Sequence, residues 1–269
     1  MGLTPDGAAA LILASAEAVK KHGLTARARI VYASKERVAD GAVTTYEDLA
    51  DPKWKGKICT RSGTNDYNIA LLGAMIVHHD EAFAKAWAEG IKANLARKPD
   101  GGDKDQVKAI AAGECDIALG NTYYLGQMLA DPEQSEWANS VRIDFPVFEG
   151  GGTHMNISGV ALTKAAPDRE AAVKLMEWLS SDEAQKIYAE TNYEFPVKPG
   201  VERSELVKSW GEFTPDTLTL SDVAAKRPDA LKLIEKEIRT IVNEAADFAE
   251  NSPEPPPSDL YTDVLVESY

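Results

Sequence analysis

Two adjacent tyrosines, Tyr123 and Tyr124, have the most distinctive chemistry in this sequence. They follow CDIALG (115–120), which predicts a buried strand, and they lie in the first turn of a helix predicted for 121–130. Neighbours on a helix point about 100° apart, so the two phenols can meet only beyond the helix N-terminus. A phenol with a pKa of about 10 becomes a ligand at neutral pH when a hard cation such as Fe(III) holds its charge. The alternative is that both tyrosines pack at a sheet edge.

A second strand-to-helix junction carries polar residues of a different kind. The strand GKICTR (56–61) is followed by a predicted helix over 62–79, and Arg61, Ser62 and Gly63 stand where the two meet. Free N–H groups at a helix start attract anions, and ligands of open α/β sheets bind at strand ends. We expect Ser62 and Gly63 to cradle a small oxyanion, with Arg61 adding positive charge.

Cysteine and histidine provide less specific signals. Cys59 and Cys115 fall in two strands that we expect to be neighbours, so a disulfide fits an oxidising compartment. Two buried thiols are the simpler expectation for the cytoplasm. His78 and His79 end the 62–79 helix, where a contact with the helix dipole is simpler than a metal site.

The elements that must position these residues alternate between strand and helix, which predicts an α/β lobe with a largely parallel sheet. Further strands and helices are predicted along the chain; the strands cover 28–34, 141–148 and 156–163, and the helices cover 5–22, 82–93, 103–113, 168–190 and 231–250. Ser180 with Glu183 forms a potential capping box that would divide the 168–190 stretch.

Composition excludes several partners. The chain has 29 basic and 43 acidic residues and a formal charge of −14, which nucleic acids and anionic membranes would repel. Membrane insertion is not expected, because no apolar run approaches the roughly 20 residues of a spanning helix. Asp6 stands where a secretory signal has Lys or Arg, so we expect a cytoplasmic protein from the chain as written.

From Arg27 to about Leu233 the chain resembles the ferric-iron substrate-binding proteins of bacterial ABC importers. The resemblance rests on TTYEDLADPKWKGKICTRSGTNDYNIALL, GGDKDQVKAIAAGECDIALGNTYYLG, HMNISGVALTKAAP, EFPVKPGVERSELVKSWGEF and TLTLSDVAAKRPDALKLI. It implies the fold of a type II periplasmic binding protein and no enzyme activity. It also implies Fe(III) ligation by Tyr67, Tyr123 and Tyr124. The matching positions Ser62, Gly63 and Asn121 would help to hold a synergistic anion such as carbonate.

The same resemblance implies an incomplete molecule, because the family begins with an export signal and part of its N-terminal lobe that have no counterpart here. Residues 2–30 resemble a thiolase fragment, and 236–269 resemble the C-terminal tail of the pyruvate dehydrogenase alpha subunit, without the catalytic motifs of either. The predicted division has an appended helix and strand (1–30), an α/β lobe with the ligand loops (31–150), a crossover strand and helices of the remaining lobe (151–233), and an appended helix, Pro-rich linker and terminal strand (234–269).

Two functions follow from these features. The first is a non-enzymatic lobe that binds Fe(III) weakly with an anion, since the facing lobe is incomplete. The second is an acidic interaction module, antitoxin-like or inhibitor-like, that sequesters a basic partner. A natural fusion and a recombined or designed sequence both account for the mosaic, and oligomerisation would cover apolar faces left by the missing part.

Overall fold

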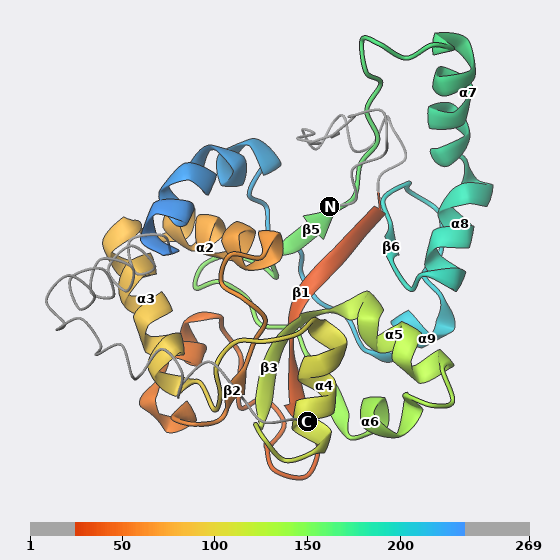
Figure 1. The fold of residues 1–269 in the computed structure, drawn as a ribbon. Coiled ribbons are helices and arrows are strands. Elements are labelled where there is room, and N and C mark those ends of the chain that lie inside the picture. The colour runs from red at the N-terminus through yellow and green to blue at the C-terminus, as the bar shows by residue number, and fades with distance from the viewer. Residues whose placement is uncertain (1–24, 235–269) are drawn as a thin grey trace, which may run out of the picture. The chain divides into compact units, whose positions relative to one another are not determined.

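The computed structural model describes residues 25–234 (Figure 1). The chain divides into two compact units after Leu231, and the elements below belong to the first. The predicted helix over 5–22, the part of the predicted 231–250 helix from residue 235 onward and the terminal strand lie outside the described residues. The four-part division predicted from the sequence stays a prediction, and strand β1 (Thr25–Ser34) continues across the predicted boundary at residue 30.

Strand β1 is the centre of the sheet, and nine of its ten residues are buried. It pairs antiparallel with four strands, which are β3 (Ile117–Asn121), β4 (Val141–Asp144), β5 (Met155–Ile157) and β6 (Phe195–Pro196). Among the strands of the described residues, β2 (Ile58–Cys59) and β3 form the only parallel pair. The prediction of a largely parallel sheet is therefore wrong, because one long strand is the antiparallel partner of most others.

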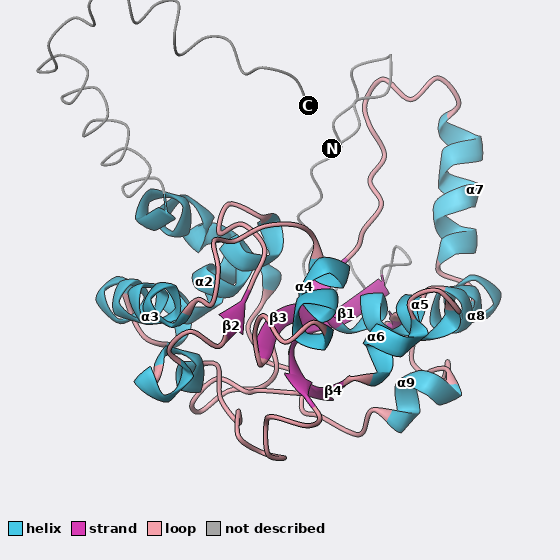
Figure 2. Cartoon of the chain, turned by 60° about the horizontal axis from the view of Figure 1, so that its bottom comes forward, coloured by secondary structure: helices cyan, strands magenta, loops and turns pink. Residues whose placement is uncertain are grey.

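Helices surround this sheet (Figure 2). The α-helices are α2 (Asp66–His78), α3 (Glu81–Asn94), α4 (Asp103–Ala111), α5 (Thr122–Ala130), α6 (Ser135–Asn139), α7 (Arg169–Leu179), α8 (Asp182–Thr191) and α9 (Glu205–Ser209). Two short 3-10 helices, η1 (Glu47–Ala50) and η2 (Pro52–Trp54), precede β2. Residues 220–231 are also helical, and Val223 approaches Gly73 of α2. No helix within 25–234 has the length and apolar character needed to cross a bilayer.

Three local predictions need correction. Helix α2 begins at Asp66 rather than at Ser62, because the Asn65 side chain caps it by accepting the N–H of Tyr67. Helix α8 is capped by Ser181, whose extended backbone lets its hydroxyl accept the N–H of Ala184, and not by Ser180. The strand predicted over 156–163 is confined to β5, with no strand at 158–163.

The core lies between β1, β3 and helices α4 and α5. Tyr32 of β1 is fully buried there, and its hydroxyl donates a hydrogen bond of 2.5 Å to the carbonyl of Asn121. A Cβ atom at Gly120 would lie 2.0 Å from the Tyr32 ring, so this position of β3 requires glycine. The close approach fixes the end of β3, from which the tyrosine pair starts.

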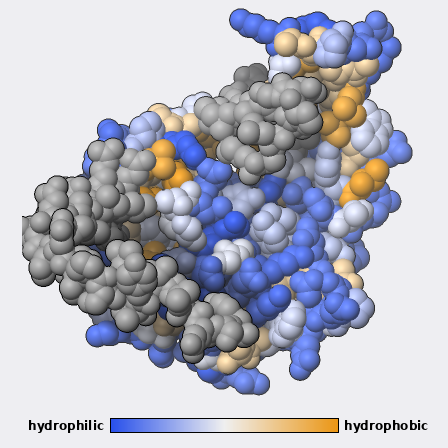
Figure 3. Space-filling model, in the orientation of Figure 1, coloured by the Kyte–Doolittle hydropathy of each residue, from blue (hydrophilic) through white to orange (hydrophobic). Residues whose placement is uncertain are grey.

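Apolar surface is exposed on α7 and α8 (Figure 3). None of the α7 residues is buried, and Leu175 and Trp178 are 54% and 44% exposed. Ile187 of α8 is 46% exposed. These exposures agree with the general expectation from the sequence that some apolar faces are left uncovered.

Candidate metal centre

The tyrosines predicted as ligands come together from two helices. Tyr67 lies in the first turn of α2, and Tyr123 and Tyr124 lie in the first turn of α5. The hydroxyl oxygens of Tyr67 and Tyr123 are 3.4 Å apart although the residues are 56 positions apart in sequence. The rings of Tyr123 and Tyr124 have centroids 4.0 Å apart. We call these three residues the tyrosine cluster.

Arg27 of β1 lies between the tyrosines. Its Nη1 atom donates to the Tyr67 hydroxyl at 3.3 Å, and its guanidinium carbon lies 5.0 Å from the Tyr123 ring centroid. Glu194 balances its charge, with an Nη2–Oε1 distance of 3.3 Å, and both side chains are almost fully buried. Arg27 thus brings positive charge to the hydroxyls that would become phenolates.

Two more arginines flank Tyr67. The guanidinium carbons of Arg29 and Arg61 lie 6.0 Å and 5.6 Å from the centroid of its ring. Both side chains also reach the carboxylate of Asp103, with Nη1–oxygen distances of 3.4 Å for Arg29 and 3.1 Å for Arg61. Arginine retains its charge at any pH relevant here, so the cluster has a permanently cationic neighbourhood.

The predicted anion-binding residues lie in two different environments. Ser62 and Gly63 are exposed in the loop before α2, and the Ser62 hydroxyl is 2.8 Å from the hydroxyl of Thr64. Asn121 is fully buried, and its Nδ2 donates to Asp103 at 3.2 Å while its Oδ1 accepts from Asn156 at 3.0 Å. Ser62 and Gly63 are therefore open to solvent, whereas the Asn121 side chain is buried and hydrogen-bonded to Asp103 and Asn156.

The protonation of the cluster follows from its surroundings. Burial raises the pKa of Tyr123, and hydrogen bonds with Tyr124 and Tyr67 raise it further. Burial by itself would lower the pKa of Arg27, but Glu194 and the neighbouring tyrosines outweigh it, and that pKa is raised. Tyr123 is consequently a neutral phenol at pH 7, so a cation that binds its oxygen must displace a proton.

Reasoning from residue types missed the charged side chains beneath the cluster. Arg27 and Arg29 are two positions apart in a strand and point to the same face, which is an available signal in the run ARARIV. No comparable sequence pattern indicated Asp103 and Glu194, because their arginine partners are far away in the sequence.

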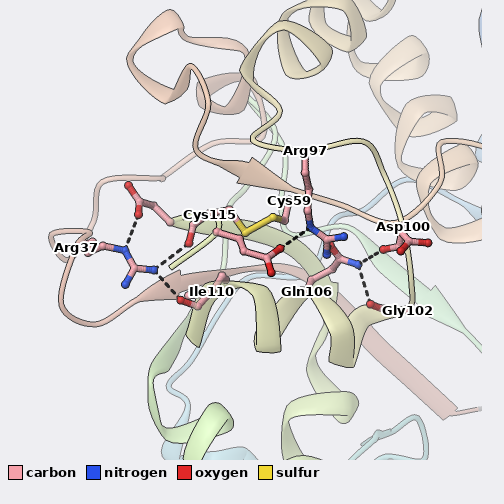
Figure 4. The surroundings of a disulfide bond; sticks show 10 residues. Arg37, Cys59, Arg97, Asp100, Gly102, Gln106, Ile110 and Cys115 are labelled. Atoms are coloured by element: carbon pink, nitrogen blue, oxygen red, sulfur yellow. Dashed lines mark hydrogen bonds and ion pairs between the residues drawn. A yellow bond between two sulfur atoms is a disulfide. The ribbon is translucent and has the colours of Figure 1, made fainter. Parts of the chain in front are cut away.

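The two cysteines are joined by a disulfide (Figure 4). Cys59 lies in β2 and Cys115 precedes β3, with Cα atoms 5.9 Å apart. Both are buried. Arg37 binds this turn by donating to the carbonyl oxygens of Cys115 at 2.9 Å and Ile110 at 2.7 Å. Of the two alternatives left open by the sequence, the structure has the disulfide and not the free thiols, since the parallel pairing of β2 with β3 brings the cysteines together.

His78 and His79 pair with carboxylates, in addition to lying at the end of helix α2. His78 Nε2 lies 2.7 Å from Asp216, and His79 Nε2 lies 2.7 Å from Glu47. Residues 25–234 contain no group of three His, Cys, Asp or Glu side chains suited to a metal ion. The tyrosine cluster is therefore the candidate metal centre of the described residues.

Comparison with known proteins decides the family. A model described as bacterial extracellular solute-binding protein matches residues 19–209. The chain belongs to this family. The members bind solutes rather than convert them, so the chain is not an enzyme, as the sequence predicted.

Relatives in this family are named for iron. Iron uptake proteins A1 and A2 of Synechocystis sp. are 44% identical over 214 residues and 41% identical over 217 residues. Each alignment covers 79% of this chain, but only 59% and 63% of those relatives. This chain thus spans about three-fifths of the length of the curated relatives that it matches.

Solved structures confirm the fold class, the α/β architecture of type II periplasmic binding proteins. Apo ferric ion-binding protein A of Pasteurella haemolytica is 53% identical with a TM-score of 0.77, covering 80% of this chain and 68% of that one. A Trichodesmium protein (IdiA, FutA) in complex with iron and citrate is 43% identical with a TM-score of 0.75, covering 80% and 68%.

Two short matches concern other families. A β-ketoadipyl-CoA thiolase of Pseudomonas putida is 88% identical over 26 residues, which is 6% of that protein. The pyruvate dehydrogenase E1 alpha subunit of Rhizobium meliloti is 51% identical over 47 residues, which is 14% of that protein. Matches of this length transfer no activity to the chain.

Proposed function

We propose that the chain binds Fe(III) through the phenolate oxygens of Tyr67, Tyr123 and Tyr124. The observation that carries the proposal is the convergence of the tyrosine cluster from the first turns of α2 and α5. Three phenolates would balance the charge of one ferric ion, and anionic oxygen is the donor that hard cations prefer. The iron uptake and ferric-binding names of the relatives support the same cargo.

An anion would complete the coordination of the ion. Arg61 carries a positive charge 5.6 Å from the Tyr67 ring centroid and directly precedes the exposed Ser62 and Gly63. Citrate is the first candidate, because the Trichodesmium relative is described with iron and citrate. Carbonate is the smaller alternative. Asn121 would contribute by fixing the start of α5, since its side chain is engaged with Asp103 and Asn156.

The proposed cellular role is based on the family to which the chain belongs. We propose that a protein containing this lobe supplies iron to an ABC importer from outside the cytoplasm, because the family is described as extracellular and its relatives here as iron uptake proteins. The expectation of a cytoplasmic protein has no support in the comparisons. The acidic interaction module with a basic partner, the designed or chimeric origin and oligomerisation stay predictions.

Iron titration tests the proposal. Addition of Fe(III) with citrate, and separately with carbonate, should produce a visible phenolate-to-iron absorption band that saturates at one ion per chain. Tyr123→Phe/Tyr124→Phe should abolish the band. Tyr188→Phe on α8 removes a phenol outside the cluster and should leave it unchanged. Absence of a band at saturating iron with either anion would refute ferric binding by this lobe.

A further inference from the structure

Asp103 connects three separate elements beneath the tyrosine cluster. It is the first residue of α4, and its side chain is fully buried. Its carboxylate accepts from Arg29 of β1 and from Arg61 after β2. It also accepts the backbone N–H of Asn121 at the end of β3, at 2.8 Å, and the Nδ2 of the same residue at 3.2 Å.

Each of these partners stands beside one of the tyrosines. Asn121 immediately precedes the first turn of α5, so its N–H contact with Asp103 fixes where Tyr123 and Tyr124 begin. Arg29 donates to Asn68, the residue after Tyr67, at 2.5 Å. Arg61 lies 5.6 Å from the Tyr67 ring centroid. A single carboxylate therefore sets the relative positions of both helix starts.

The charges in this group do not cancel. Asp103 contributes one negative charge against the positive charges of Arg29 and Arg61, so one positive charge remains. Arg29 is completely buried and needs the carboxylate, because an unpaired buried charge is strongly unfavourable. Arg61 is 20% exposed at its side chain, so the remaining positive charge lies on the solvent side, where an anion would approach.

We propose that Asp103 is a positioning residue of the iron site. Its hydrogen bonds with Asn121, Arg29 and Arg61 fix the positions of the tyrosine cluster and of the Arg61 guanidinium relative to one another. The proposal rests on the ferric-binding function proposed above. It assigns Asp103 no direct contact with iron. Outer residues of this kind commonly change metal affinity by about 10- to 100-fold when they are replaced.

The first test compares Asp103→Asn with Asp100→Asn, an exposed carboxylate three residues earlier that serves as the matched control. Asp103→Asn should weaken Fe(III)–citrate binding by about tenfold or more and shift the phenolate-to-iron band. Asp100→Asn should bind like the parent chain. A purely structural role would lower the unfolding temperature of Asp103→Asn but leave the affinity and the band of the folded fraction unchanged, and this result would overturn the proposal.

A second variant keeps the inference testable if Asp103→Asn does not fold. Arg29→Gln/Asp103→Asn replaces the buried ion pair by two neutral amides, leaves Arg61 in place and preserves the net charge of the group. The proposal predicts that this variant folds but still loses iron affinity about tenfold relative to Arg29→Gln alone. Equal affinity of the double and single variants would overturn it. If the parent chain itself shows no phenolate-to-iron band, the proposed ferric binding is refuted instead.

Discussion

Under the proposed function, protons and iron would compete for the hydroxyl oxygens of the tyrosine cluster. Tyr123 is 8% exposed, and burial together with its tyrosine neighbours raises its pKa. The nearby guanidinium of Arg27 would favour the phenolate once the proton has left, which explains how a buried phenol can still serve as a ligand. The protonation of these tyrosines should therefore make iron binding depend on pH.

Iron affinity should rise with pH. Binding must displace the phenol protons, so between pH 6 and pH 8 the apparent association constant should increase by about tenfold per pH unit for each proton released. Titrations at fixed ionic strength with a competing chelator of known proton affinity would measure this slope. An affinity independent of pH would contradict phenolate coordination.

His154 should make folding stability depend on pH. Burial lowers its pKa to about 4, with the charge of Arg29 adding to the effect. The usual value is about 6.5, so the unfolded chain binds a proton more readily and the free energy of unfolding should fall by about 2 kcal/mol from pH 7.5 to pH 5. Urea unfolding at both pH values should show a smaller difference for His154→Gln. An identical pH dependence in both proteins would remove His154 as the cause.

At the scale of elements, the site is built from helix starts held to strand ends. Asn65 caps α2 two residues before Tyr67, and β3 ends at Asn121, two residues before Tyr123. Helix α4 links them through Asp103 at its first residue, and the disulfide fastens the turn after its last residue to β2. Displacement of α4 would therefore affect both halves of the cluster.

Removal of the disulfide should destabilise this arrangement. Cys59→Ser/Cys115→Ser opens a covalent loop with a sequence separation of 56 residues. Closing loops of this size stabilises folded proteins by about 2–4 kcal/mol, chiefly by restricting the unfolded chain. Urea unfolding should show this loss, and a reductant should lower the stability of the parent chain but not of the variant. Equal stability of both proteins under oxidising conditions would contradict the disulfide's structural role.

At the scale of the whole molecule, local and global charge have opposite signs. The chain carries a formal charge of −14, which would repel citrate at a distance. The cluster is nevertheless flanked by Arg27, Arg29 and Arg61, with Asp103 and Glu194 as their paired carboxylates. One positive charge remains, so the site itself favours an anion.

Bound iron should stabilise the folded chain. A ligand that binds only the native state at 100 times its dissociation constant adds about 2.7 kcal/mol to the free energy of unfolding. Thermal unfolding with saturating Fe(III)–citrate should therefore occur at higher temperature than with citrate alone. The same shift in Tyr123→Phe/Tyr124→Phe would show that the stabilisation arises elsewhere.

Local pattern was sufficient to predict most elements. Apolar periodicity predicted α3 over 82–93 and the structure has Glu81–Asn94, while the 168–190 stretch does divide into two helices. The boundaries at Ser62 and Ser180 were misplaced, because neighbouring Asn65 and Ser181 are equally good caps and the local sequence does not choose between them.

Local spacing along the chain was enough to predict the tyrosine pair, its position at the start of a helix and the polar residues at a second junction. Three further features could be found only in the folded molecule: the antiparallel pairing of β1 with four strands, the bond between Cys59 and Cys115, and the contacts of Asp103 with Arg29, Arg61 and Asn121. Strand pairing and buried charge depend on residues far apart in the chain. These interactions stabilise the protein only when folding brings the residues together and removes the water between them.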